Sequence, residues 1–235
     1  MNASTRIIFM GTPDFSVPAL QKLAKQPGFD ICLVVTQPDR PKGRGKKLAF
    51  SPVKTAALSL GLDVYQPETL KTAEAVSKLE SFNPDFFVVA AFGQILSHKV
   101  LDIPRFYPIN IHASLLPRYR GASPIQAAIK NMDSETGITT MVMASKMDAG
   151  DILLVDKTAV SETDTAQTLH DRLGQMGGSL IVQTIDQILA GSLKPQPQDH
   201  SQATYVKLLK KQDGRIDWNL SGAQIQAHIN AMTPW

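Results

Sequence analysis

The sequence is poor in features that define whole classes of protein. It contains one cysteine, Cys32, so no disulfide can form within the chain, as suits a reducing compartment. No apolar run approaches the ~20 residues that span a bilayer. The strand-like segment RIIFMG begins at Arg6 and leaves no room for a signal peptide. We therefore expect a cytoplasmic protein with no membrane partner.

Several common site motifs are missing as well. The five histidines show no metal-ligand spacing, and one cysteine cannot make a thiolate zinc site, so we expect no metal. Neither a G-x-S-x-G elbow nor a G-x-x-x-x-G-K-[ST] phosphate loop is present. The first strand ends in GTPDF rather than G-x-G-x-x-G, which argues against a dinucleotide cofactor. Cys32 lies in the apolar run ICLVV, and we interpret it as a structural thiol.

What the chain does have is an alternation of strand and helix patterns. Of its 235 residues, 43% are hydrophobic and 19% charged, which is typical of a packed globular protein. Short β-branched runs alternate with amphipathic segments, so we expect an α/β fold: a Rossmann-like, open, mostly parallel sheet with helices on both faces. The last two runs read as an antiparallel pair. The expected strands are 6–11, 30–36, 85–92, 108–114, 136–144 and 151–160, and the expected helices are 16–26, 51–61, 72–82, 123–131 and 165–191.

The pattern breaks after Gly191. The segment SLKPQPQDHSQATY at 192–205 is polar and contains prolines, which is typical of a linker. Residues 206–235 restart with a strand and a helix capped by Ser221, and are too short to bury a core of their own. We interpret 1–191 as one domain, 192–205 as a linker and 206–235 as the beginning of a second domain.

The charge of the chain is concentrated in one segment, PDRPKGRGKKLAF at 38–50. The whole chain has 24 basic and 21 acidic residues, a formal charge of +3, and this segment alone accounts for the excess. A solvated charge run is the ordinary interpretation. The segment nevertheless follows the second strand, so it projects from the edge of the sheet where ligands bind. Its glycines and prolines favour a loop, and its basic residues are Arg40, Lys42, Arg44, Lys46 and Lys47.

Polar residues inside the run PINIHAS are the second candidate site. Asn110 and His112 are two apart on a strand, so both side chains project to the same face. The ordinary alternative is a core histidine hydrogen-bonded to an asparagine. Asp148, in the loop SKMDAGDILL, is a third candidate, although a carboxylate in such a loop commonly caps a turn.

The order of four motifs resembles one family. GTPDF, VVTQPDRPKGRGKKL, NIHASLLPRYRGASPIQ and MDAGDIL follow each other as in the methionyl-tRNA formyltransferases, and the resemblance covers nearly the whole chain. NIHASLLPRYRG with a downstream D-x-G-D is similar to the wider group of folate-dependent formyltransferases. That group includes glycinamide ribonucleotide and sugar-nucleotide formyltransferases. The basic segment narrows the match to the tRNA enzymes.

The resemblance implies transfer of a formyl group from 10-formyltetrahydrofolate to the α-amine of methionine on initiator methionyl-tRNA. It places the family's catalytic residues at Asn110, His112 and Asp148, within a catalytic domain at 1–191. Members carry a C-terminal, OB-like β-barrel domain that binds tRNA, and 206–235 would be the beginning of it. We expect a monomer. The family's folate-contacting loop falls on Ser114, Leu115, Leu116 and Pro117, and its tRNA-contacting loop on Arg40, Lys42, Arg44, Lys46 and Lys47.

Two alternatives remain open at this point. A glycinamide ribonucleotide or sugar formyltransferase would share Asn110, His112 and Asp148 but would have no use for the basic segment. A nucleic-acid-binding module would use the basic segment, and its polar strand residues would be structural.

Overall fold

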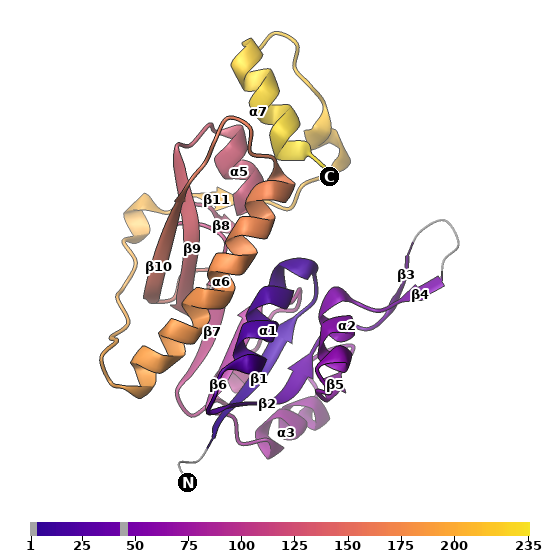
Figure 1. Cartoon of the computed structure of the whole chain (residues 1–235), viewed down its shortest axis with the longest axis vertical. Coiled ribbons are helices and arrows are strands. Elements are labelled where there is room, and N and C mark those ends of the chain that lie inside the picture. The colour runs from indigo at the N-terminus through magenta and orange to yellow at the C-terminus, as the bar shows by residue number, and fades with distance from the viewer. Residues whose placement is uncertain (1–3, 43–46) are drawn as a thin grey trace.

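The computed structural model describes residues 4–42 and 47–235, and its central feature is a seven-stranded sheet in the order β10-β9-β7-β6-β1-β2-β5 (Figure 1). The parallel strands are β1 (Thr5–Gly11), β2 (Phe29–Val35), β5 (Val64–Tyr65), β6 (Phe86–Ala90) and β7 (Tyr107–His112). Strand β9 (Glu135–Val142) is antiparallel to β7, and β10 (Ile152–Ala159) is antiparallel to β9. The expected Rossmann-like, mostly parallel sheet is confirmed. The two-residue strand β5 was not expected.

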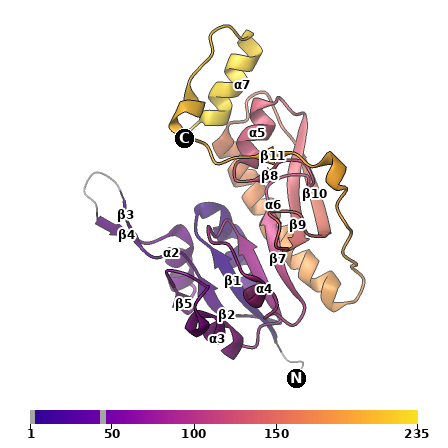
Figure 2. The same cartoon turned by 180° about the vertical axis from the view of Figure 1, so that it is seen from behind.

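Both faces of this sheet are covered, because apolar side chains alternate between two cores. In β1, Ile7 and Phe9 belong to one core and Ile8 and Met10 to the other. Helices α1 (Val17–Lys25), α2 (Pro52–Ser59), α5 (Pro124–Lys130) and α6 (Ala166–Leu189) contribute to the first core. Helices α3 (Ala73–Ser81) and α4 (His98–Leu101) contribute to the second, on the face seen in Figure 2. In the part of the chain that the structure describes, no helix is long and apolar enough to cross a bilayer.

Several helices, among them α2 and α7, begin where a side chain satisfies one of their free N–H groups. Ser51 accepts a hydrogen bond from Lys54 N at the start of α2, with Pro52 in the first turn. Ser221 likewise accepts from Gln224 N at the start of α7 (Gly222–Met232), so the cap expected at Ser221 is confirmed. Helix α6 packs closely along α1, and a Cβ added at Gly178 would meet Pro18 O at 2.9 Å. The absence of a side chain at Gly178 lets the two backbones approach.

The basic segment forms a hairpin rather than the simple loop that its glycines and prolines suggested. Strand β3 (Arg40–Lys42) pairs antiparallel with β4 (Lys47–Ala49), and the pair projects from the body of the molecule in Figure 1. Proline is compatible with such an edge strand because one side of the strand needs no N–H donor. Arg44 and Lys46 lie outside the described residues, as do the side chains of Lys42 and Lys47.

The segment after α6 returns along the sheet and is hydrogen-bonded to it. Gln196 forms an antiparallel bridge with Ile152, and β11 (Tyr205–Val206) pairs in parallel with β8 (Arg120–Gly121). Helix α7 then packs against α5. The strand expected after 206 was wrong: within 207–235 the structure has a 3-10 turn, η3 (Lys211–Gly214), and α7, but no strand. The division at 192–205 and 206–235 into linker and second domain stays a prediction.

Cys32, on β2, has a thiol of low reactivity. Its Sγ donates to Ile7 O at 3.4 Å, and burial raises the pKa of the thiol to about 11. Little thiolate is therefore present at neutral pH, which agrees with the interpretation of Cys32 as a structural thiol.

Candidate active site

The site lies at the carboxyl edge of the sheet, where the strand order changes direction. From β1 the chain proceeds to β2 and β5 on one side, and then returns to β6 and β7 on the other. Loops that follow adjacent strands meet at such a point and form a crevice. Here they are also hydrogen-bonded: Thr12 Oγ1 donates to Phe92 O at 2.9 Å, and Ser16 Oγ donates to Ala90 O at 2.6 Å. The GTPDF motif is thus part of the crevice wall.

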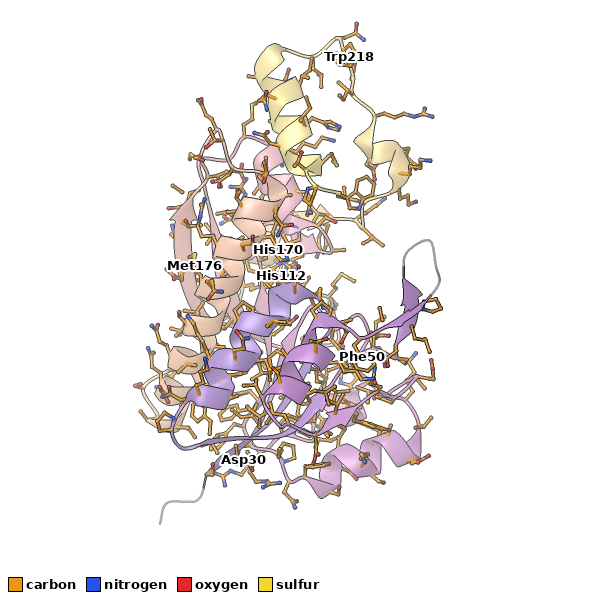
Figure 3. All side chains as sticks on the ribbon, turned by 45° about the vertical axis from the view of Figure 1, so that its right-hand side comes forward. Asp30, Phe50, His112, His170, Met176 and Trp218 are labelled. Carbon is orange, nitrogen blue, oxygen red and sulfur yellow. The ribbon has the colours of Figure 1, made fainter. Side chains whose placement is uncertain are left out.

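A groove of about 500 Å³ opens beside these loops. It connects GTPDF with the base of the β3–β4 hairpin, so the structure brings together two motifs that the sequence analysis described separately. Figure 3 shows Phe50 on the side of the hairpin and His112 near the middle of the molecule. The lining residues include Thr12, Pro13, Gln37, Arg40, Phe50 and Gly93.

Asp39, the one acid of the basic segment, has partners outside the hairpin. Hydrogen bonds from the Lys54 ammonium and the Gln66 amide lower the pKa of its carboxyl group. The carboxylate is therefore ionised and paired with Lys54 at the start of α2.

His112 stands at the end of β7 with one ring nitrogen already engaged. Its Nε2 lies 3.0 Å from Tyr119 O. A carbonyl oxygen can only accept, so Nε2 must carry a hydrogen and donate it. This leaves Nδ1 for proton exchange, and Nδ1 lies 3.8 Å from Asp148 Oδ2. Among the described residues no hydrogen bond joins His112 to Asn110, so His112 is not the asparagine-paired core histidine of the alternative interpretation.

Asp148 is held by a residue far away in the sequence. Its Oδ2 accepts a hydrogen bond of 2.8 Å from Gly121 N, 27 positions away, rather than from its own turn. Among the described residues no hydrogen bond ends on its Oδ1. The backbone of Asp148 is left-handed, with φ of 49°, a conformation that aspartate tolerates better than most residues. The structure therefore brings Asp148 and His112 together with one carboxylate oxygen left for a substrate or a water.

Asn110 precedes this pair on the same strand. It lies opposite Val89 of β6 and Met141 of β9, and it is half-buried. Within residues 4–42 and 47–235 its side-chain amide forms no hydrogen bond. The amide is therefore available to a ligand, and the catalytic role expected of Asn110 stays a prediction.

The SLLP loop follows directly and is tied down from β9. The buried Thr139 hydroxyl donates to Ser114 O at 2.6 Å and accepts from Leu116 N at 3.3 Å. Ser114 is fully buried, and its hydroxyl donates to Arg118 O at 2.6 Å, so this side chain closes the loop. Leu115 and Pro117 are half-buried. The folate contacts expected of Ser114, Leu115, Leu116 and Pro117 stay a prediction.

We expect Thr139→Val, which keeps the shape but removes both hydrogen bonds, to loosen this loop. The buried Ser114 O and Leu116 N lose their partner, so the free energy of unfolding should fall by about 1–3 kcal/mol. Urea unfolding measures that decrease, and the KM for the formyl donor should rise in the same variant. Thr163→Val, in an exposed loop, is the matched control. An unchanged stability would show that Thr139 does not support the SLLP loop.

Sequence reasoning missed Thr139, Arg120 and Gln198, which surround the site. A threonine in a buried strand and an arginine in the RYRG stretch are weak signals, and Gln198 lies in the supposed linker. Among the residues that the structure describes, no group of three or more His, Cys, Asp or Glu side chains is arranged to hold a metal ion.

Comparison with known proteins identifies the family. The formyl transferase family matches residues 5–185. A methionyl-tRNA formyltransferase of Marinobacter nauticus is 51% identical over 230 residues, covering 98% of this chain and 74% of the relative. The chain belongs to the methionyl-tRNA formyltransferase family. Another member of this family, from Clostridium acetobutylicum, is 49% identical over 231 residues with the same coverage of both chains.

Solved structures share the fold of this family at much lower identity. An N-formyltransferase from Helicobacter canadensis, solved with folinic acid and dTDP-3-aminofucose, gives a TM-score of 0.73 at 20% identity, covering 97% of this chain and 80% of that one. HypX from Aquifex aeolicus, solved with tetrahydrofolic acid, gives 0.70 at 14% identity, covering 99% of this chain and 35% of HypX. At these identities the likeness shows the α/β fold alone.

Proposed function

We propose that this chain transfers the formyl group of 10-formyltetrahydrofolate to the α-amino group of methionine on initiator methionyl-tRNA. The observation that carries the proposal is the His112–Asp148 pair, 3.8 Å apart at the carboxyl edge of the sheet, in a chain about half identical to methionyl-tRNA formyltransferases. The projecting basic hairpin beside the site favours a tRNA acceptor over a small amine.

The substrate amine is the nucleophile, so the protein needs to supply only donors, acceptors and position. Attack of the amine nitrogen on the formyl carbon forms a C–N bond and places negative charge on the formyl oxygen. The unengaged amide of Asn110 is the donor that we assign to this oxyanion. Collapse of the intermediate breaks the bond to N10 of the folate, and N10 takes up, as it leaves, the proton that the amine has lost.

His112 and Asp148 together move the proton that the amine loses. Since Nε2–H is donated to Tyr119 O, only Nδ1 of His112 can take it up. The imidazolium that forms then lies against the Asp148 carboxylate, which stabilises it. Asp148 Oδ1, which accepts no hydrogen bond from the described residues, is the second acceptor that we assign to this proton, directly or through a water. Nε2 is not available as an oxyanion donor, because it already donates to Tyr119 O.

The two substrates approach from different loops. We assign the formyl donor to the SLLP loop and the acceptor end of the tRNA to the groove between GTPDF and the hairpin. We further propose that the protein acts as a monomer in the cytoplasm, where tRNA is charged and where a single free cysteine stays reduced. Light scattering of the purified protein tests the monomer.

Formyl transfer to three acceptors, offered separately with 10-formyltetrahydrofolate, tests the proposed function. We expect turnover with initiator methionyl-tRNA and little or none with an amino-sugar nucleotide or glycinamide ribonucleotide. Preference for either small acceptor would assign the chain to another formyltransferase activity. Binding of tRNA without any transfer would make it a binding module.

The hairpin should give the reaction its salt dependence. Removing one lysine–phosphate interaction reduces the slope of log K against log salt by about 0.7–0.9, so replacing Lys46 and Lys47 together by alanine should flatten it by roughly 1.5–2. The measurement is kcat/KM for tRNA over a range of salt concentrations. A double alanine variant of Lys71 and Lys99, exposed lysines just before α3 and within α4, removes the same charge and should leave the slope unchanged. Equal slopes for the two double variants would show that the basic residues of the hairpin are simply solvated and do not contact tRNA phosphates.

A further inference from the structure

Gln198 is buried against the loop that carries Asp148, although it belongs to the segment 192–205. Its Nε2 donates to Asp148 O at 2.9 Å and to Gly150 O at 2.6 Å. Its Oε1 accepts from Arg120 Nε at 3.2 Å and from Arg120 Nη2 at 2.7 Å. The two carbonyls can only accept and the guanidinium can only donate, so a single orientation of the amide satisfies all four bonds.

Arg120 is 2% exposed and has no acidic partner among the described residues. Besides Gln198, its guanidinium donates to the Tyr205 hydroxyl at 3.1 Å and to His200 Nδ1 at 2.9 Å. A buried charged group that is hydrogen-bonded only to neutral acceptors lowers the free energy of unfolding. Stability alone is therefore a poor explanation of this arginine, and its one link toward the site runs through Gln198.

The same short strand also holds the carboxylate of Asp148. Gly121, next to Arg120 on β8, donates its N–H to Asp148 Oδ2 at 2.8 Å. Asp148 is thus held at its side chain by Gly121 and at its backbone carbonyl by Gln198. Its left-handed backbone, with φ of 49°, persists only where surrounding groups hold it.

We propose that Gln198 and Arg120 are positioning residues, which hold the Asp148 loop at the separation from His112 that formyl transfer requires. The proposal rests on the function proposed above for Asp148. It makes the segment 196–206 part of the active site, because Arg120 is anchored there by Tyr205 and His200 and by the pairing of β11 with β8.

Gln198→Ala tests this against Gln196→Ala as the matched control. Gln196 has an exposed side chain that bonds only Lys194 O in its own segment. A displacement of a reacting group by about 1 Å costs up to roughly 10²-fold, so we expect Gln198→Ala to lower kcat about 10- to 100-fold. Both KM values should change less than about 3-fold, because neither substrate is assigned to Gln198. Rates are referred to the folded fraction measured by circular dichroism, and Gln196→Ala should equal the parent protein.

A double variant with Asp148→Asn distinguishes a positioning role of Gln198 from a role in general stability. If Gln198 acts only through Asp148, then adding Gln198→Ala to the Asp148→Asn variant should lower kcat no further. Losses that multiply, or a loss of kcat that merely follows the folded fraction, would overturn the proposal. Full activity of Asp148→Asn would overturn the proposed function as well, whereas a crippled Asp148→Asn beside a fully active Gln198→Ala would overturn this inference alone.

Tyr205→Phe carries the test if Gln198→Ala does not fold. Tyr205 is 68% exposed, and the change removes only the hydroxyl that accepts from Arg120 Nη1. One of several groups that anchor Arg120 is lost, so a smaller displacement than in Gln198→Ala is expected, and kcat should fall about 2- to 10-fold with unchanged KM values. A kcat equal to that of the parent protein would overturn the proposal.

Discussion

Asp148→Asn is expected to lower kcat for formyl transfer by about 10²–10⁴-fold, the usual range for loss of a positioned acid or base. The amide oxygen can keep the hydrogen bond from Gly121 N, so the loop should retain its shape. What disappears is the negative charge 3.8 Å from His112 Nδ1 and the ability to accept a proton. Single-turnover rates with saturating substrates measure the loss. Asp156→Asn, exposed on β10, is the control that should change nothing.

His112→Ala should be similarly damaging, and the double variant should be little slower than either single one. Residues that act as one unit give losses that do not add, because the first substitution already removes the function of the pair. His98→Ala, an exposed histidine at the start of α4, should retain the parent rate. Independent losses that multiply in the double variant would show that His112 and Asp148 do not work together.

Asn110→Ala is expected to lower kcat by roughly 10²–10³-fold, the cost of removing one oxyanion donor. Since its amide makes no hydrogen bond with the described residues, the truncation should leave the neighbouring strands β6 and β9 in place. The dissociation constant for the folate should change far less than kcat, because the oxyanion exists only during the reaction.

Equilibrium binding of the folate and rapid-quench kinetics separate these two effects. Asn219→Ala, in the exposed segment before α7, is the matched control. A rate for Asn110→Ala within about five-fold of the parent rate would be far below the loss of an oxyanion donor, and Asn110 would need another role.

The sequence alone was sufficient for the layered fold and for part of the site. Residues 7–10 of β1 and every residue of β6 are apolar, so neither face of these strands can meet water, and helices must cover both. Ser51 and Ser221 marked helix starts because a serine oxygen satisfies free N–H groups within the same turn. Asn110 and His112 could be paired because a strand repeats every two residues. These are all local rules, and they act over a few positions.

Contacts between distant segments were decided only by the tertiary structure. Gly121 N reaches Asp148 across 27 positions and Gln198 reaches its carbonyl across 50, so no periodicity or turn rule connects them. The polar composition of 192–205 predicted a solvated linker, yet Gln198 is buried there because Arg120 and two carbonyls satisfy its amide. The strands of the basic hairpin were missed because their composition favours a loop, and only the antiparallel pairing of β3 with β4 reveals them. Burial and hydrogen bonding between remote residues depend on how the sheet brings its loops together, and that information is not present in any short stretch of the chain.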